Sequence, residues 1–270
     1  MELTVDTREG KAVAYAYTGG KAFDAALPCV VFIHGALNDH SVWTLLARWF
    51  AHHGQRVLAF DLPGHGRSLG PPLASVEAAA DWVLAALDAA GVASAALVGH
   101  SMGSLIALEA AARAPARVSK LVMVGTACPM KVSDALLDTA RDAPLRAIDM
   151  VNAFSHSGFA AKPSYPGPGS WLHGADRALM RRVQAGQTAV NLFHHDFGVC
   201  NAYAGGFGAA AQVRCPAHLV LGDRDRMTPP RQAREITQAL KAQVHTVPAG
   251  HALMSEAPDA VLAALRSALH

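Results

Sequence analysis

The stretch AALVGHSMGSLIAL, residues 95–108, places a serine between an apolar run and an Ala/Leu-rich segment. The run AALV predicts a buried strand and SLIAL predicts a helix, so Ser101 lies on the turn between them. Gly99 and Gly103 lie two residues before and two residues after Ser101, where a sharp turn leaves no room for side chains. Such a turn presents the serine hydroxyl clear of the sheet. It also leaves the backbone N–H of Met102 at the helix start, directed at developing negative charge.

The same alternation of strand and helix signals continues on both sides of this turn. Short apolar runs alternate with Ala/Leu-rich stretches, and the main runs are CVVFI, RVLAF, KLVMV, HLVLG and VHTV. Continuous apolar runs are typical of strands covered on both faces of a parallel sheet. LTVDT and AVAYAY, separated by the turn REGK, indicate an opening hairpin. The sequence therefore predicts an α/β fold with a mostly parallel, doubly wound sheet of about eight strands.

One long interval lacks strand signals. About ninety residues separate VMVGT from HLVLGD, which is too long for a structureless connection in a compact domain. The interval contains helical pieces at 132–151 and 176–193 and the Pro/Gly-rich loop 160–170. We expect residues 128–211 to form a helical cap inserted after the sixth strand of a core made of 1–127 and 212–270.

The insertion also predicts the character of a ligand pocket. Acidic residues are sparse around its aromatic side chains, so we expect a mostly apolar pocket. At helical spacing, most of these aromatics are expected to pack inside the cap, and only some to face a ligand. The segment KPSYPGPGS is interpreted either as a rim over the entrance or as a surface connector. The aromatic residues concerned are Phe154, Phe159, Tyr165, Trp171, Phe193, Phe197, Tyr203 and Phe207.

Composition and termini argue against several classes of protein. The chain has 270 residues, of which 51% are hydrophobic, and a net charge of +2 without a dense basic block. Nothing here indicates binding to nucleic acid or to an anionic membrane. The start MELTVDTREG has no signal-peptide pattern and the apolar runs are too short to span a bilayer, which predicts a cytoplasmic location. The four scattered cysteines are interpreted as free thiols. His194, His195 and Asp196 lack a second ligand cluster, so no metal or other cofactor is predicted.

A reactive serine requires a base that removes its proton. In this topology the partners follow in the order serine, acid, histidine. Of the histidines well beyond the insertion, His218 precedes the acid candidates, His245 falls inside a predicted strand and His270 ends the chain. His251, just after VHTV, is therefore the predicted base.

The acid must follow another strand, and Asp223 and Asp225 both come directly after AHLVLG. Residues two apart on an extended strand point to the same side, so strand geometry does not choose between them. Arg224 and Arg226 are potential ion-pair partners of either carboxylate. The residues alone leave this choice open.

These motifs together resemble the α/β-hydrolase superfamily, and the resemblance covers nearly the whole chain. It implies an α/β-hydrolase fold with a helical cap, in which the aspartate three residues after the glycine, Asp225, is the acid and Asp223 is structural. It further implies Ser101 as nucleophile, His251 as base, and the N–H groups of Ala36 and Met102 as oxyanion donors. The matching motifs are His34-Gly35, DLPGHGRS, GHSMG, G-x-x-D at Gly222 to Asp225, and Gly250-His251.

The segment DLPGHGRS is expected to have a structural role. Asp61, Gly64 and Gly66 are predicted to fix the loop, and Ser68 to cap it or hydrogen-bond within it.

The resemblance implies a serine hydrolase that cleaves carboxylic esters of small to medium, mostly apolar substrates through an acyl-enzyme. Three alternatives remain. Carbon–carbon hydrolases of aromatic-ring degradation have a similar triad, but many have Asn where this chain has His100. Cofactor-free perhydrolases or haloperoxidases share the GHSMG pattern. A ligand-binding protein without turnover is the third, although it has no use for an activated nucleophile. The sequence gives no indication of oligomeric state.

Overall fold

The computed structural model describes residues 1–7 and 10–270, and the strands in these ranges form an eight-stranded sheet. The strand order is β1-β2-β4-β3-β5-β6-β7-β8. β1 pairs antiparallel with β2 and β2 with β4, whereas all later pairings are parallel. The predicted mostly parallel sheet is confirmed, as is the opening hairpin, although part of its expected turn, residues 8–9, lies outside the described residues. The strands are β1 (Glu2–Thr7), β2 (Gly10–Tyr17), β3 (Cys29–Ile33), β4 (Arg56–Phe60), β5 (Ala95–His100), β6 (Val118–Val124), β7 (Ala217–Gly222) and β8 (Gln243–Val247).

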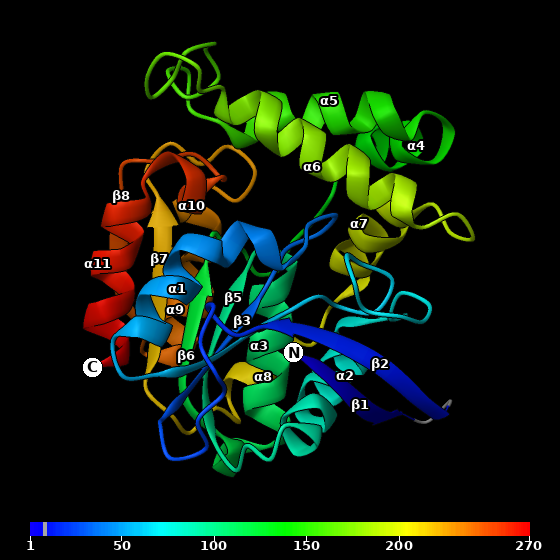
Figure 1. Ribbon diagram of the computed structural model, residues 1–270. Helices are drawn as coiled ribbons and strands as arrows, with labels where there is room; N and C mark the ends of the chain where they lie inside the picture. Colours follow the sequence, from blue (N-terminus) through cyan, green and yellow to red (C-terminus); the bar gives the residue numbers. More distant parts are fainter. Residues whose placement is uncertain (8–9) are drawn as a thin grey trace.

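Helices cover both faces of the sheet (Figure 1). Side chains of α2 (Val76–Ala89), α3 (Met102–Arg113) and α9 (Arg234–Leu240) belong to the core on one face. Those of α1 (Thr44–His52), α10 (Leu253–Glu256) and α11 (Pro258–Leu269) belong to the core on the other. Short 3-10 helices occupy His40–Trp43 (η1), Pro115–Arg117 (η2) and Pro230–Ala233 (η3). This doubly wound arrangement explains why the central strands are apolar along their whole length.

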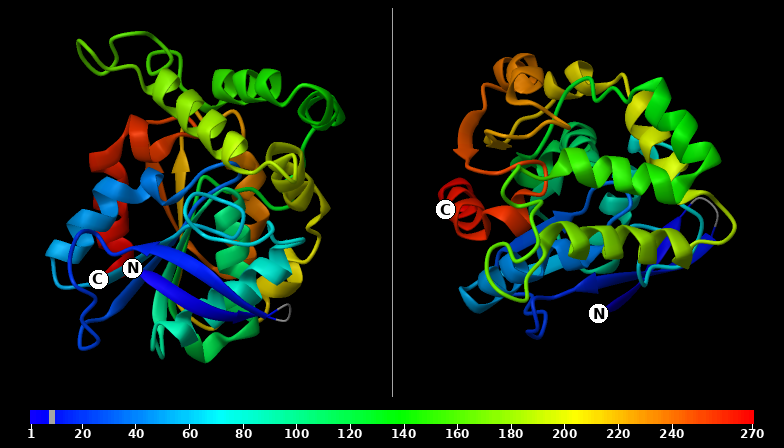
Figure 2. Two further views of the ribbon diagram at one scale, coloured as in Figure 1. Left: turned by 45° about the vertical axis from the view of Figure 1, so that its right-hand side comes forward. Right: turned by 90° about the horizontal axis from the view of Figure 1, so that it is seen from above.

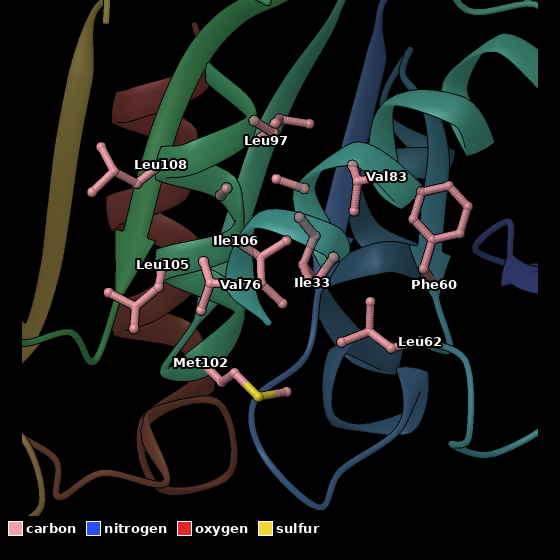
Figure 3. Close-up of a cluster of buried hydrophobic side chains, with 14 of the residues drawn as sticks. Ile33, Phe60, Leu62, Val76, Val83, Leu97, Met102, Leu105, Ile106 and Leu108 are labelled. Atoms are coloured by element: carbon pink, nitrogen blue, oxygen red, sulfur yellow. The ribbon is translucent and has the colours of Figure 1, made fainter. Parts of the chain in front are cut away.

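The core on the α2/α3 face surrounds the turn that carries Ser101. Figure 3 shows Ile33 and Leu97 of the central strands β3 and β5 beside Ile106 of α3 and Val76 of α2. Each is almost completely buried. Full burial of one such side chain contributes about 1.5–3 kcal/mol, so the start of α3 is rigidly held against the sheet.

The long interval between β6 and β7 is helical. Figure 1 shows α4, α5 and α6 across the top of the molecule, and the right-hand view of Figure 2 shows α5 and α6 from above. The last short helix, α8, packs instead against α3 and α9. None of the described helices is long and apolar enough to cross a membrane. The helices are α4 (Asp134–Asp142), α5 (Pro144–Ser155), α6 (Leu172–Gly186), α7 (Leu192–Ala202) and α8 (Gly206–Ala210).

Each of the two long helical pieces expected in this interval is divided in the structure. The first breaks at Ala143, whose backbone leaves the helical conformation (φ −147°, ψ 71°) because it precedes Pro144. The second ends at Gly186, and a new helix starts after Asn191, whose side chain caps α7 by accepting a hydrogen bond from the His194 N–H.

Candidate active site

Ser101 occupies a strained turn between β5 and α3. Its backbone has a φ of 51° and a ψ of −119°, a left-handed conformation that a non-glycine residue adopts only where its surroundings enforce it. A side chain at Gly99 would place its Cβ 2.0 Å from the Gly103 carbonyl oxygen, and one at Gly103 would place it 2.4 Å from the Ile33 oxygen. The predicted need for glycine at both positions is confirmed.

Ser101 and His251 line one cavity of about 320 Å³ between the sheet and the insertion. Among the described residues, no hydrogen bond joins the two side chains, and both remain open to a ligand. In enzymes without bound substrate, a contact between a nucleophile and its base is commonly long and tightens when substrate binds. The lining also includes Gly35, Ala36, Asn38, His100, Met130, Lys131, Val132, Ser133, Leu136, Met150, Val151, Phe154, Ser155, Met180, Phe197, Cys200, Arg226, Met227 and Thr228.

The structure brings Asp225, and not Asp223, to His251. Asp225 Oδ2 lies 2.8 Å from His251 Nδ1 and is buried. Asp223 is exposed, with Oδ1 3.6 Å from Nε of Arg224. Arg226 pairs with neither aspartate, since its guanidinium donates to the backbone carbonyl oxygen of Ala153.

Hydrogen bonds from the loop itself hold the Asp225 carboxylate. Its Oδ1 accepts from the N–H groups of Met227 and Thr228, both at 2.8 Å, and its Oδ2 from the Thr228 hydroxyl at 2.8 Å. Burial opposes ionisation, but the interactions with His251 and Thr228 lower the pKa of Asp225 to about 2. Because an ionised carboxylate only accepts, His251 Nδ1 carries the proton and Nε2 is left to accept one.

Thr228 was not singled out by the sequence. An aspartate in a loop often accepts from the backbone N–H two residues on, an Asx-turn that anticipates the Met227 contact, but no such signal identifies the Thr228 hydroxyl.

The backbone of Ala36 is oriented by a buried histidine. His34 Nδ1 lies 2.8 Å from the Gly35 carbonyl oxygen, and the Leu62 N–H donates to His34 Nε2 at 3.1 Å. Burial and the neighbouring His65 lower the pKa of His34 to about 4, so the ring is neutral and donates only from Nδ1. The Gly35 carbonyl and the Ala36 N–H belong to one trans peptide and point in opposite directions. His34 therefore turns the Ala36 N–H away from itself.

Neither predicted oxyanion donor is hydrogen-bonded within the described part of the protein. The N–H groups of Ala36 and Met102 donate to no protein acceptor there. Ala36 lines the cavity, and Met102 is the first residue of α3, whose leading N–H groups have no partner within the helix. Both are available to an anionic oxygen beside Ser101.

Two other segments bind the backbone of His251. Its N–H donates to the Ser155 carbonyl oxygen at the end of α5, at 2.7 Å. His100 Nε2 lies 3.0 Å from the His251 carbonyl oxygen, and burial and the nearby His251 lower the pKa of His100 to about 3. The neutral His100 ring packs 4.8 Å from that of His251.

The DLPGHGRS segment is a structural loop, as predicted. The buried Asp61 carboxylate accepts from the His40 N–H at 2.7 Å and from the Arg67 N–H at 2.8 Å. The Ser68 hydroxyl donates to the Asp61 carbonyl oxygen at 2.6 Å. A Cβ on Gly66 would lie 2.3 Å from Asp61 Oδ2, so this glycine is required by the same network.

The cavity is mostly apolar, as expected, but more methionines than phenylalanines line its wall. Phe159, Trp171 and Phe207 are exposed, so the expectation that most aromatics of the insertion pack inside the cap is wrong. Phe193 and Tyr203 are buried in the core, and Phe154 and Phe197 line the cavity. Met130, Met150, Met180 and Met227 also line it. Residues 162–170 are not among the described lining residues, which favours the interpretation of that loop as a connector.

Within the described residues, Asp39, His40 and Asp61 are the side chains close enough together to share a metal ion. Their ligand atoms are already engaged, since Asp39 accepts from Arg182 at 2.8 Å and Asp61 from His40. In the His194-His195-Asp196 group, Asp196 Oδ1 lies 3.2 Å from His195 Nδ1, and its Oδ2 accepts from His65 at 2.8 Å. The chemistry of these donors therefore gives no reason to assign an ion to either group.

A family model described as the alpha/beta hydrolase fold matches residues 28–258. An sn-1-specific diacylglycerol lipase of Mus musculus is 33% identical over 135 residues, which is 50% of this chain and 44% of the relative. A non-heme chloroperoxidase of Streptomyces lividans is 35% identical over 153 residues, 56% of this chain and 53% of the relative. The chain thus spans about half the length of these curated relatives.

Solved structures share the whole fold. A thermophilic esterase from Thermogutta terrifontis superposes with a TM-score of 0.82 at 20% identity, covering 100% of this chain and 97% of that one. At this identity the likeness concerns the architecture.

Proposed function

Because this chain belongs to the alpha/beta hydrolase fold family, we propose that it is a serine hydrolase that cleaves carboxylic esters through an acyl-enzyme. The observation that supports this most is the buried 2.8 Å contact between Asp225 and His251, facing the same cavity as the Ser101 turn. A carboxylate held in this way orients the imidazole and stabilises its protonated form, which is the requirement for activating a serine.

In the proposed reaction, Ser101 Oγ attacks the ester carbonyl carbon while His251 Nε2 accepts the hydroxyl proton. The N–H groups of Ala36 and Met102 donate to the resulting oxyanion, and each such donor lowers the barrier by about 3 kcal/mol. The carbon–oxygen bond to the alcohol then breaks, and His251 returns the proton to the leaving oxygen. Water repeats the sequence on the acyl-enzyme, releasing the acid and restoring Ser101.

Two adjoining cavities suggest where the acyl part and the alcohol part of an ester bind. The first, which contains Ser101, is proposed to take a mostly apolar acyl group. The second has a volume of about 540 Å³ and shares Asn38, His100, Ser155, Met180 and His251 with the first, but not Ser101. His251 must protonate the departing alcohol, so we assign the second cavity to the alcohol part.

The proposal is tested by the release of p-nitrophenol from a short acyl ester and by labelling with a fluorophosphonate. We expect a burst of product followed by slower turnover, and labelling of the wild-type protein. Ser101→Ala is expected to abolish both. A wild-type protein that is neither labelled nor active on activated esters would instead favour a ligand-binding role.

A second candidate activity is the formation of peracids from carboxylic acids at the same site. The similarity to a non-heme chloroperoxidase of Streptomyces lividans supports this activity. Here hydrogen peroxide, rather than water, would attack the acyl-enzyme, giving a peracid and free Ser101. Peroxide-dependent halogenation faster than ester hydrolysis would favour this reading. A ring-fission dienone consumed faster than any ester would favour carbon–carbon hydrolysis.

The domain boundaries, the binding partner and the cellular location stay predictions. We propose residues 128–211 as the cap, inserted into a core of 1–127 and 212–270, with a small-molecule ester as partner. Replacing the cap by a short linker is expected to change substrate preference. Cell fractionation tests the cytoplasmic location.

A further inference from the structure

Three segments far apart in the sequence meet at the carboxylate of Asp196. Asp196 lies on α7 of the insertion, His65 on the loop after β4, and Leu37 on the loop after β3. Asp196 Oδ2 accepts from the Leu37 N–H and lies 2.8 Å from both that nitrogen and His65 Nε2. The two side chains are each only 2% exposed.

The Asp196–His65 contact is a buried ion pair. His65 Nδ1 lies 3.1 Å from the Pro63 carbonyl oxygen, and Nε2 faces the carboxylate. Because both neighbours are acceptors, the ring donates from both nitrogens and is positively charged. Burial opposes this charge, but Asp196 outweighs it and raises the pKa of His65. The reciprocal charge of His65 keeps the pKa of Asp196 well below its usual range.

The residue held by Asp196 is conformationally strained. Leu37 is fully buried and has a φ of 55°, in the left-handed region that side chains with a Cβ disfavour. Such a conformation persists only where surrounding contacts enforce it. Leu37 directly follows Ala36, whose N–H is a proposed oxyanion donor, so any relaxation of Leu37 rotates the backbone beside that donor.

We propose that Asp196 is a positioning residue, which through the Leu37 N–H fixes the backbone after Ala36 and couples helix α7 to the oxyanion site. This inference rests on the proposed function. His34 fixes the peptide that contains the Ala36 N–H, and Asp196 fixes the next one. The insertion thereby contributes to the geometry of the reaction centre in addition to covering it.

The experiment must separate positioning from stability. A single Asp196→Ala change leaves a buried charge on His65 and can prevent folding. We therefore use the double variant Asp196→Leu/His65→Leu, because apolar replacement of a buried ion pair is often neutral for stability. Asp196→Asn retains an oxygen acceptor for the Leu37 N–H. Asn191→Ala is the matched control, since it removes the cap of α7 without contacting Leu37.

The expected result is selective loss of the chemical step. For the double variant we expect kcat to fall roughly 10- to 100-fold, somewhat less than the effect of deleting one oxyanion donor, with KM within about twofold. Affinity for a trifluoromethyl ketone, which forms an anionic adduct with the serine, is expected to weaken by the same factor. Asp196→Asn is expected to recover most of the rate, and Asn191→Ala to lower the melting temperature alone.

Hydrogen exchange provides a readout independent of activity. The Leu37 amide is expected to exchange faster in the double variant than in the wild type or in Asp196→Asn. A folded double variant with wild-type kcat, ketone affinity and Leu37 protection would overturn the inference while leaving the proposed function intact. A wild-type protein without esterase activity or probe labelling would overturn both.

Discussion

The two halves of the proposed site use their polar atoms in opposite ways. On the Asp225–His251 side, every carboxylate oxygen of Asp225 is bonded by the protein, through the loop N–H groups, Thr228 and the imidazole. On the Ser101 side, the N–H groups of Ala36 and Met102 have no protein acceptor within the described residues. Satisfied groups hold a fixed geometry, whereas unpaired donors are available for a charge that develops only in the transition state.

The two halves are also held by different kinds of contact. Side-chain hydrogen bonds hold Asp225, whereas backbone packing at Gly99 and Gly103 holds Ser101. A neutral replacement of Asp225 should therefore act most strongly on activity, whereas a side chain added at Gly103 should act most strongly on stability.

Asp225→Asn is expected to give the largest effect, a fall in kcat of about 10⁴-fold, because an amide does not hold the histidine in the productive tautomer. Steady-state hydrolysis of a p-nitrophenyl ester measures it. Asp223→Asn is the matched control, because among the described residues the exposed Asp223 carboxylate is paired with Arg224 alone, and its rate is expected to stay at the wild-type value. Equal losses in the two variants would contradict the assignment.

Gly103→Ala is expected to lower the free energy of unfolding by about 3 kcal/mol, because the new Cβ would lie 2.4 Å from the Ile33 carbonyl oxygen. Gly198 lies inside α7 with no atom within 4 Å of such a Cβ. Gly198→Ala is therefore expected to raise stability by about 1 kcal/mol. Urea denaturation of both proteins checks the contrast, and similar stabilities would show that the Ser101 turn is loosely packed.

Acid is expected to weaken the Asp225 half selectively. The pKa of Asp225 is about 2, against an ordinary value of 3.8. Because the pKa is lower in the folded state, ionised Asp225 contributes about 2 kcal/mol of stability, complete above about pH 4 and lost as the pH falls through about 2. Urea denaturation of wild type and Asp225→Asn at successive pH values measures this. Equal acid sensitivity of the two proteins would contradict it.

The smallest effect on activity is expected in the second cavity, which is proposed to bind the alcohol part and is lined by Leu179. Leu179→Trp is expected to slow the hydrolysis of esters with bulky alcohols about tenfold, with little effect on methyl esters. The converse control is Leu136→Trp in the acyl cavity, which should instead discriminate by acyl-chain length. If both variants alter the same preference, the two cavities do not divide the substrate as proposed.

The sequence was informative where the function depends on local backbone geometry. Gly99, Ser101 and Gly103 predict a strand–turn–helix unit because the crowding arises within a few residues, and continuous apolar runs predict buried parallel strands. By contrast, Asp223 and Asp225 are locally equivalent, and only the folded loop shows which one reaches His251.

Contacts between distant segments could not be predicted. Asp196 meets Leu37 and His65 only after the insertion has folded onto the core. The methionines of the cavity wall come from four separate segments, and no spacing along the chain indicates that they converge. The break at Ala143, in contrast, was available from Pro144 in the sequence.

The most direct test is to stop the turnover of p-nitrophenyl acetate in acid and to identify the acylated residue by peptide mass spectrometry. We expect an acetyl group on Ser101 during the steady state, absent in Ser101→Ala and accumulating with the product burst. Sustained ester hydrolysis with Ser101 unmodified, or with the acetyl group on another residue, would contradict it.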